Sequence, residues 1–257
     1  MDEKNLKSNN NPVDDLAEEV IEKAGEEIKA SQADIDAVKE MISVGAMFGH
    51  KKTKTNPKFK NFIFTSRSGV EIIDLTKTLS FLEKAGEFLK DQIKQGKTIV
   101  FVATQPAAWE TIENLAKKFN MPYVKRRWIG GLLTNFKSLS GRLEYFKKTK
   151  AGMAKGEFEK YTKKERSIIN KNIAKMEDLF GGLENLTSLA DVLFVVDSSI
   201  KGHMTAIREA KIIKIPIVAI IDSDDNPEII NYPIPANDHA KMSIDWIINK
   251  IAEKMNS

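Results

Sequence analysis

Three aspartates after an apolar run are the residues of this sequence best placed to bind a divalent cation. Asp222, Asp224 and Asp225 follow the run 215–221, which is typical of a buried strand. Clustered carboxylates at a strand end hold magnesium in many phosphoryl-transfer sites. A divalent-cation-dependent small-molecule enzyme is therefore one hypothesis. The alternative, which we favour, is a solvated loop in which these residues form turns before Pro227.

Other signs of catalysis are weak. The sequence contains neither a Gly-x-Gly-x-x-Gly motif nor a phosphate-binding Gly-x-x-x-x-Gly-Lys-Ser/Thr motif. His50 is interpreted as a packing residue or a donor to a phosphate, and His203 and His239 as structural or exposed residues. The absence of cysteine excludes thiolate zinc sites and cysteine nucleophiles. We therefore expect no catalytic residue, no metal site and no cofactor.

Two dense basic segments suit the phosphates of a nucleic acid. Lysine neutralises phosphates, arginine forms forked hydrogen bonds to them, and an aromatic ring can stack on an unpaired base. The first segment comprises Lys51, Lys52, Lys54, Lys58, Lys60 and Arg67, with no acidic residue between its ends. The second comprises Lys125, Arg126, Arg127, Trp128, Asn135 and Lys137. We predict that both bind RNA, although for Trp128 alone a role as a core anchor is the favoured alternative.

The charge is distributed unevenly along the 257 residues. The net charge of +4 conceals a basic middle, residues 41–180, with 28 Lys and Arg against 13 Asp and Glu. Residues 1–40 hold 5 basic and 12 acidic residues, and residues 181–257 hold 7 and 11. No apolar stretch approaches the roughly 20 residues of a membrane span, and no signal peptide is recognised. The pattern favours a cytoplasmic protein with a nucleic-acid partner and no membrane partner.

Alternating apolar patterns predict an α/β fold with a parallel sheet covered on both faces. The predicted strands of this sheet are residues 97–103, 122–124, 192–196 and 215–221, with helices at 77–95, 107–119 and 204–214. Two short strands, 62–64 and 70–73, are predicted after the first basic segment.

An inserted helical hairpin is predicted over about residues 136–182. Apolar residues recur there at helical spacing on both sides of a lysine-rich tip. Thr162 and Glu165 have the spacing of a capping box for the second helix, which Gly181 and Gly182 would end. The narrow apolar stripes indicate a short antiparallel coiled coil.

The acidic segment 1–40 is predicted to be a partly helical extension, with helices at about 13–30 and from Ser31 onward. Because its negative charge opposes binding to phosphate, we expect it to contact a protein or the basic body, and not RNA.

An ordered set of motifs resembles the bacterial ribosomal protein S2 family over about residues 41–250. The matching segments are 45–50 (GAMFGH), 56–58 (NPK), 62–64 (FIF), 72–78 (IIDLTKT), 127–135 (RWIGGLLTN), 162–165 (TKKE), 193–197 (LFVVD) and 234–238 (IPAND). Two turns depart from the family pattern, Gln105-Pro106 and residues 198–202. No RNA contact is therefore expected from the first turn, and no ion or protein contact is carried over to the second.

The resemblance implies a three-layer, flavodoxin-like parallel sheet with an inserted coiled-coil hairpin, all within one domain of residues 41–257. It also implies a structural, non-enzymatic role in the small (30S) ribosomal subunit. The expected partners are 16S ribosomal RNA and neighbouring small-subunit proteins, including ribosomal protein S1 in organisms that have it, with no small-molecule substrate. Subunit assembly and the docking of those proteins are the expected contributions to translation.

Overall fold

Five parallel strands form the main sheet of the protein. The computed structural model describes residues 18–21 and 32–256. The strand order is β5-β4-β6-β7-β8, and every neighbouring pair is parallel. The strands are β4 (Ile99–Val102), β5 (Tyr123–Val124), β6 (Val192–Val196), β7 (Ile217–Ile221) and β8 (Tyr232–Pro235). This order is that of flavodoxin-like, doubly wound sheets, which confirms the predicted fold class.

The central strands are buried on both faces because each face packs against helices. In β4, Val100 and Val102 belong to one apolar cluster, while Ile99 and Phe101 belong to the cluster on the opposite face. All four side chains are fully buried. Because both faces of the sheet are covered, successive residues of a strand are all buried and apolar and do not alternate with polar ones. This explains the continuous apolar runs in the sequence.

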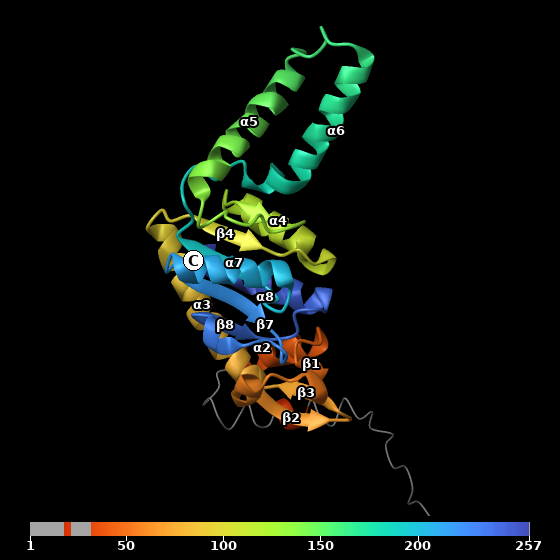
Figure 1. Cartoon of the computed structure of the whole chain (residues 1–257). Coiled ribbons are helices and arrows are strands. Elements are labelled where there is room, and N and C mark those ends of the chain that lie inside the picture. The colour runs from red at the N-terminus through yellow and green to blue at the C-terminus, as the bar shows by residue number, and fades with distance from the viewer. Residues whose placement is uncertain (1–17, 22–31, 257) are drawn as a thin grey trace, which may run out of the picture.

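Helices cover the sheet in two layers (Figure 1). One face packs against α3 (Leu75–Lys94), α4 (Trp109–Lys118) and α8 (Lys241–Asn256). The other face packs against α7 (Lys201–Ile212) and the base of the helical hairpin. Short 3₁₀ turns, η3 (Pro106–Ala108) and η5 (Pro227–Ile229), follow β4 and precede β8.

The inserted hairpin consists of α5 (Phe136–Ala154) and α6 (Lys163–Phe180), which extend away from the sheet in Figure 1. The predicted capping box is present, because the Thr162 side chain accepts from the Glu165 N–H and the Glu165 carboxylate accepts from the Thr162 N–H. Helix α6 ends at Phe180, and η4 (Gly181–Leu183) follows it. Phe146 and Phe180 pack together with ring centroids 6.2 Å apart. The helical hairpin is confirmed, whereas a supercoil between its helices stays a prediction.

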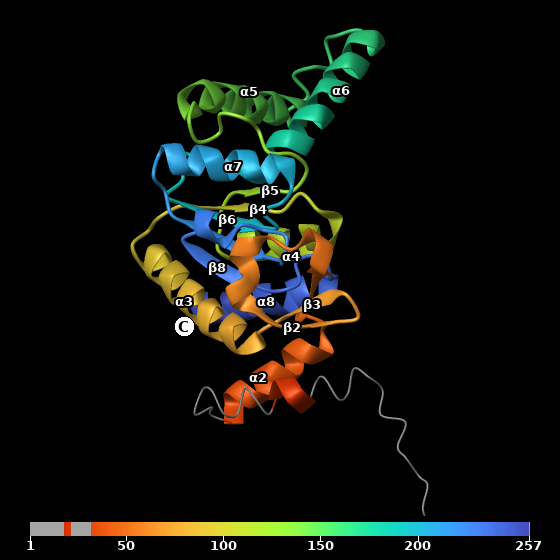
Figure 2. The same cartoon turned by 60° about the horizontal axis from the view of Figure 1, so that its bottom comes forward.

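A separate antiparallel sheet, which we call the small sheet, contains β1 (Phe48–Lys51), β2 (Ile63–Arg67) and β3 (Val70–Ile73) in the order β1-β3-β2. The small sheet and the hairpin lie at opposite ends of the body in Figures 1 and 2. Strand β1 was not predicted, since it contains a glycine, a histidine and a lysine after its single apolar residue. The 3₁₀ turns η1 (Lys52–Lys54) and η2 (Pro57–Phe62) connect β1 to β2.

Helix α2 (Gln32–Ser43) precedes the small sheet, as predicted. Residues 18–21 are helical, and Val20 is buried in a cluster with Met41 and Leu75. The rest of the helix expected at 13–30 lies outside the described residues. Among the residues described, no helix is long and apolar enough to cross a membrane.

Strand β8 and helix α8 complete the fold and were not among the predicted elements. Two prolines interrupt the apolar pattern of β8, and β8 tolerates them because it lies at the edge of the sheet. Helix α8 did carry a usable signal, since Ile244, Ile247, Ile248 and Ile251 are buried at helical spacing.

Candidate nucleic-acid interface

The first basic segment presents most of its lysines to solvent. Its side chains at positions 51, 52, 54 and 60 are exposed, and within the described ranges none of the four forms an ion pair. Lys58 pairs with Glu228, which lies far along the chain. The lack of acidic residues between Lys51 and Arg67 therefore does not leave every cation free. Arg67 is only partly exposed, at the end of β2.

The backbone of this segment is fixed to the main sheet. The Asn56 N–H donates to the Ser223 carbonyl at 2.8 Å. The Asn56 side chain caps η2 by accepting from the Lys58 N–H at 3.0 Å. Phe59 is fully buried in the core that lies on the α7 side of the sheet. A buried aromatic between exposed lysines orients the segment with its cations outward.

A buried carboxylate organises the second basic segment. The Glu209 side chain on α7 is 6% exposed. It accepts hydrogen bonds from the Trp128 indole N–H at 3.1 Å, the Gly131 N–H at 2.8 Å and the Leu133 N–H at 3.1 Å. Trp128 is itself 4% exposed, so its ring is not presented for stacking on a base. Trp128 is therefore a core anchor, which was the favoured alternative for this residue.

The cations of the second segment differ in their surroundings. Lys125 donates to Glu113 at 2.6 Å, and hydrogen bonds from Lys117 and Lys125 lower the pKa of Glu113 to about 2. Arg126 lies over the Trp109 ring, 4.4 Å from its centroid. Arg127 and Lys137 are exposed and form no ion pair within the described part of the chain, and the uncharged Asn135 is exposed as well.

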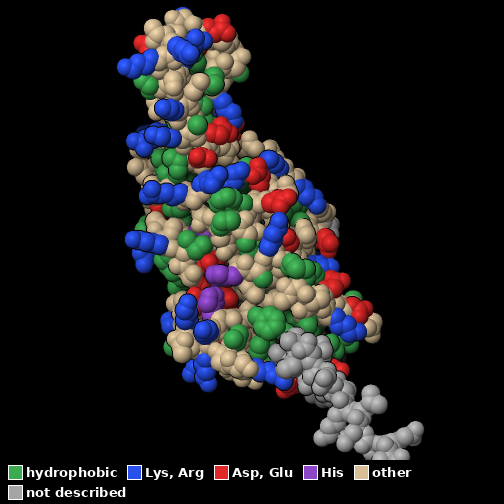
Figure 3. Space-filling model, turned by 90° about the vertical axis from the view of Figure 1, so that its right-hand side faces the viewer, with side chains coloured by type: hydrophobic (Ala, Val, Ile, Leu, Met, Phe, Trp, Pro, Cys, Tyr) green, Lys and Arg blue, Asp and Glu red, His purple; other side chains and the backbone are tan. Residues whose placement is uncertain are grey.

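The two basic segments lie along the same edge of the main sheet. Lys125 directly follows β5, and Ser223, which holds Asn56, follows β7. Parallel strands end at one edge, and three strand spacings between β5 and β7 correspond to roughly 15 Å. The arrowheads of β4 and β7 in Figure 1 point toward the side shown in Figure 3, where Lys and Arg recur along one margin from the base to the hairpin.

The aspartates after β7 form turns before Pro227, as expected, but the prediction that this loop is solvated is wrong. Asp222 and Asp225 are 2% and 3% exposed, whereas Asp224 is partly exposed. Asp225 accepts from the Ser198 hydroxyl at 2.6 Å, and its burial raises its pKa to about 7. Asp222 pairs with His50 at 2.8 Å.

The histidines also differ from the expectation in part. His203 is fully buried, with Nδ1 donating to the Asp197 carbonyl and Nε2 accepting from the Thr104 N–H. Its burial lowers its pKa, so its structural role is confirmed. His239 is exposed but not isolated, because its ring lies 4.9 Å from that of His50.

Comparison with known proteins identifies the family. The sequence pattern of the family "Ribosomal protein S2" matches residues 41–257. The small ribosomal subunit protein uS2 of Dictyoglomus thermophilum is 44% identical over 216 residues, covering 84% of this chain and 87% of the relative. The proteins of the same name from Coprothermobacter proteolyticus and Corynebacterium diphtheriae are 43% and 40% identical, and each match covers 84% of this chain and 80% of the relative.

These relatives give no support to the hypothesis of an enzyme that uses Asp222, Asp224 and Asp225, since the matched family is a structural component of the ribosome. The resemblance predicted over about residues 41–250 is confirmed, since the family match spans residues 41–257. The chain belongs to the ribosomal protein S2 family.

Proposed function

We propose that this chain binds 16S ribosomal RNA through the two basic segments at the carboxyl edge of its main sheet. As a member of the ribosomal protein S2 family it is a structural, non-enzymatic constituent of the small ribosomal subunit, and so part of the cytoplasmic ribosome. The observation that carries the proposal is the row of exposed, unpaired cations in the first segment. Folding leaves such charges available for phosphates, and their binding releases counterions.

The first segment provides the stronger contact. Lys51, Lys52 and Lys54 are consecutive or nearly so, exposed, and placed on β1 and η1. Their backbone is held by the small sheet on one side and by the bond from Asn56 to Ser223 on the other. A fixed backbone with free cationic ends loses less conformational entropy on binding than a flexible loop.

The second segment contributes through Arg127, Asn135 and Lys137. Arg127 follows the partly engaged Lys125 and Arg126 and immediately precedes the buried Trp128. Because Trp128 and the backbone after it are bonded to Glu209, Arg127 is fixed at the surface. We assign Trp128 the role of an anchor that positions its neighbours.

Protein partners form the second part of the proposal. Neighbouring small-subunit proteins, including ribosomal protein S1 where an organism has it, would contact surfaces other than the two basic segments at the carboxyl edge of the main sheet. The acidic residues 1–40 and the acidic end 181–257 suit basic protein partners better than RNA.

Replacing three lysines tests the RNA contact. The variant Lys51→Ala, Lys52→Ala, Lys54→Ala removes exposed charges that form no ion pair in the described chain. We expect its affinity for 16S ribosomal RNA, measured by filter binding at low salt, to fall at least about tenfold. The slope of log affinity against log salt should become shallower by up to about 3, because each phosphate contact contributes about 0.9.

A matched control uses Lys94, Lys118 and Lys211. Each lies exposed in the last turn of a helix that precedes a strand, and therefore at the opposite edge of the sheet. Alanine at these three positions removes the same total charge and should change the salt slope by less than about 1. Equal losses in both triple variants would show that the net charge, and not the carboxyl edge, determines binding.

A further inference from the structure

Carboxylates and imidazoles converge at the carboxyl edge of the main sheet, beside the first basic segment. Asp197 follows β6, Asp222 follows β7, and Asp238 lies in the loop after β8. His50 on β1 and His239 in the same loop as Asp238 complete the group. Parallel strands end at one edge, so residues that are distant in sequence are brought together there.

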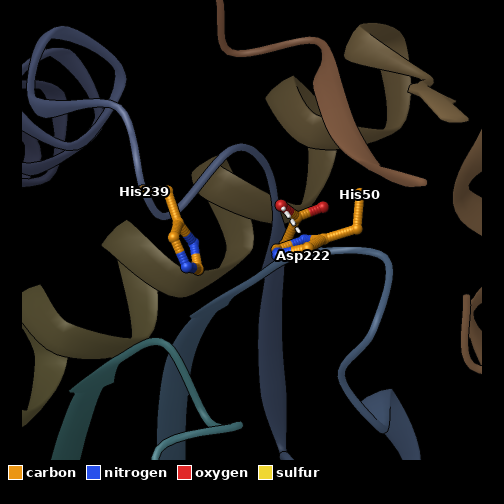
Figure 4. A group of neighbouring side chains, drawn as sticks. All are labelled: His50, Asp222 and His239. Atoms are coloured by element: carbon orange, nitrogen blue, oxygen red, sulfur yellow. Dashed lines mark hydrogen bonds and ion pairs between the residues drawn. The ribbon is translucent and has the colours of Figure 1, made fainter. Parts of the chain in front are cut away.

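Three of these side chains lie close enough together to bind one metal ion. His50, Asp222 and His239 each offer one ligand atom, and these atoms all lie within 4.8 Å of one another. The His50 Nδ1 lies 2.8 Å from the Asp222 carboxylate. Figure 4 shows the three side chains arriving from separate segments, with the His239 ring turned toward the pair of His50 and Asp222.

A buried oxygen without a partner lies next to this set. Asp238 is 1% exposed, and its Oδ2 has no hydrogen-bond partner among the residues that the structure describes. Its Oδ1 accepts from His239 Nδ1 at 2.6 Å. A second set of ligand atoms, from Asp197, Asp238 and His239, also lies within 4.8 Å. An unpartnered buried carboxylate oxygen is costly, and the positive charge of a cation bound close by would offset part of that cost.

Negative charge at this position is not balanced by lysine or arginine. Five carboxylates gather here, and none forms an ion pair with a lysine or arginine within the described residues: Asp197, Asp222, Asp224, Asp225 and Asp238. Among the residues that the structure describes, the ion-pair partners of this group are the imidazoles of His50 and His239.

We propose that His50, Asp222 and His239 bind a zinc-type transition-metal ion, with Asp238 orienting the His239 ring. Two imidazole nitrogens and one carboxylate are ligands that Zn²⁺ accepts, whereas Mg²⁺ and Ca²⁺ prefer oxygen. Zn²⁺ holds its ligands at about 2.0 to 2.2 Å, so ligand atoms would approach to roughly 3.3 Å from one another. The spacing in the structure requires only small side-chain movements. A carboxylate bonded to the second nitrogen of a ligating histidine is a common orienting contact.

The ion would tie the small sheet to the main sheet. His50 lies on β1 directly before Lys51, while Asp222 and His239 belong to loops of the main sheet. The junction already contains a bond from the His50 N–H to the Ser223 hydroxyl at 2.8 Å. Metal binding would stabilise this junction and hold the first basic segment at a fixed angle to the sheet. The proposal does not depend on RNA binding.

A competition titration on the purified, chelator-stripped full chain tests the proposal. Zn²⁺ is added in the presence of a chromophoric chelator, and Co²⁺ is added separately to record its visible absorption. We expect one Zn²⁺ per chain, a tetrahedral Co²⁺ spectrum, and a rise in Tm of about 5 to 10 °C at a hundredfold excess over Kd. Mg²⁺ at the same concentration should leave Tm unchanged.

Variants identify the ligands. His239→Gln replaces an exposed ring that is a proposed ligand, and it should weaken Zn²⁺ binding more than about 100-fold. Asp238→Asn changes only the group that orients this ring, and it should weaken Zn²⁺ binding by about 10- to 100-fold. Glu228→Gln is the matched control, because Glu228 is an exposed carboxylate outside both ligand sets and should leave Zn²⁺ affinity unchanged. Equal Zn²⁺ affinity in the wild type and in His239→Gln would overturn the proposal, as would a stabilisation by Mg²⁺ equal to that by Zn²⁺.

Discussion

Glu209 determines the shape of the second basic segment. Its buried carboxylate on α7 accepts hydrogen bonds from the Trp128 indole N–H and from the backbone N–H groups of Gly131 and Leu133. Gly131 adopts a positive φ of 87°, which glycine tolerates without steric cost. The segment is therefore a loop held by a single acceptor group. Its backbone is fixed, and so are the positions from which its exposed side chains extend.

Removing this acceptor should destabilise the protein. Glu209→Ala leaves several buried donors without a partner, each worth about 1 to 3 kcal/mol, so the free energy of unfolding should fall by about 3 to 5 kcal/mol. Urea unfolding followed by tryptophan fluorescence measures the change. Glu209→Gln keeps one carbonyl acceptor and should lose less. If Glu209→Ala unfolds at the wild-type urea concentration, the carboxylate does not organise the loop.

The residue types were enough to predict which segments carry exposed cations. They were not enough to predict which individual side chains are buried or paired. The density of lysine in the first segment predicted exposed cations, and exposure is what the structure shows. The burial of Trp128 depends on Glu209, and the contact of Lys58 depends on Glu228. Both partners lie far away in sequence, where spacing carries no signal. The same reason hid the approach of His50 to His239.

At the scale of elements, the small sheet is docked tightly on the main sheet. On β1, the His50 N–H donates to the Ser223 hydroxyl at 2.8 Å. The residues on either side of β1 add two bonds, from the Asn237 N–H to the Ala46 carbonyl at 3.0 Å and from the Asn56 N–H to the Ser223 carbonyl. Gly49 on β1 allows a close approach to the loop after β7. A Cβ at this position would lie 2.9 Å from the Ser223 hydroxyl and 3.2 Å from the Glu71 carbonyl.

A methyl group at Gly49 should therefore separate the two sheets. For Gly49→Ala we expect the free energy of unfolding to fall by about 1 to 3 kcal/mol, as in other overpacked cores, measured by chemical denaturation. Gly141→Ala on α5 is the control, since no atom lies within 4 Å of its Cβ position. It should be neutral or stabilise by up to about 1 kcal/mol. A Gly49→Ala protein as stable as the control would contradict this account of the junction.

Helices and strands with a strong apolar pattern were predictable from the sequence. Strands that form because of pairing with a neighbouring strand were not. The apolar run 192–196 became β6 with the same bounds, and the capping box at Thr162 starts α6. Strand β1 contains mainly polar or small residues because its pairing with β3 fixes it. Strand β8 is an edge strand with two prolines. These two elements become strands through their partners, which their own residues do not reveal.

At the scale of the whole molecule, folding brings the segments to which we assign function to one edge of the main sheet. The carboxyl ends of the parallel strands place both basic segments and the proposed metal site on the same side of the sheet. The hairpin and the small sheet extend this side in opposite directions (Figures 1 and 3). Within the part of the chain that the structure describes, the opposite edge of the sheet carries exposed lysines at helix ends but no comparable dense segment. This asymmetry agrees with a protein that binds a large anionic partner through one side.

Sedimentation of cell lysate through a sucrose gradient tests the central claim most directly. At low salt the chain should co-migrate with the small ribosomal subunit, and the bound fraction should fall as salt rises. The variant Lys51→Ala, Lys52→Ala, Lys54→Ala should dissociate at lower salt than the control Lys94→Ala, Lys118→Ala, Lys211→Ala. A wild-type chain found only in the soluble top fractions at low salt would contradict the account.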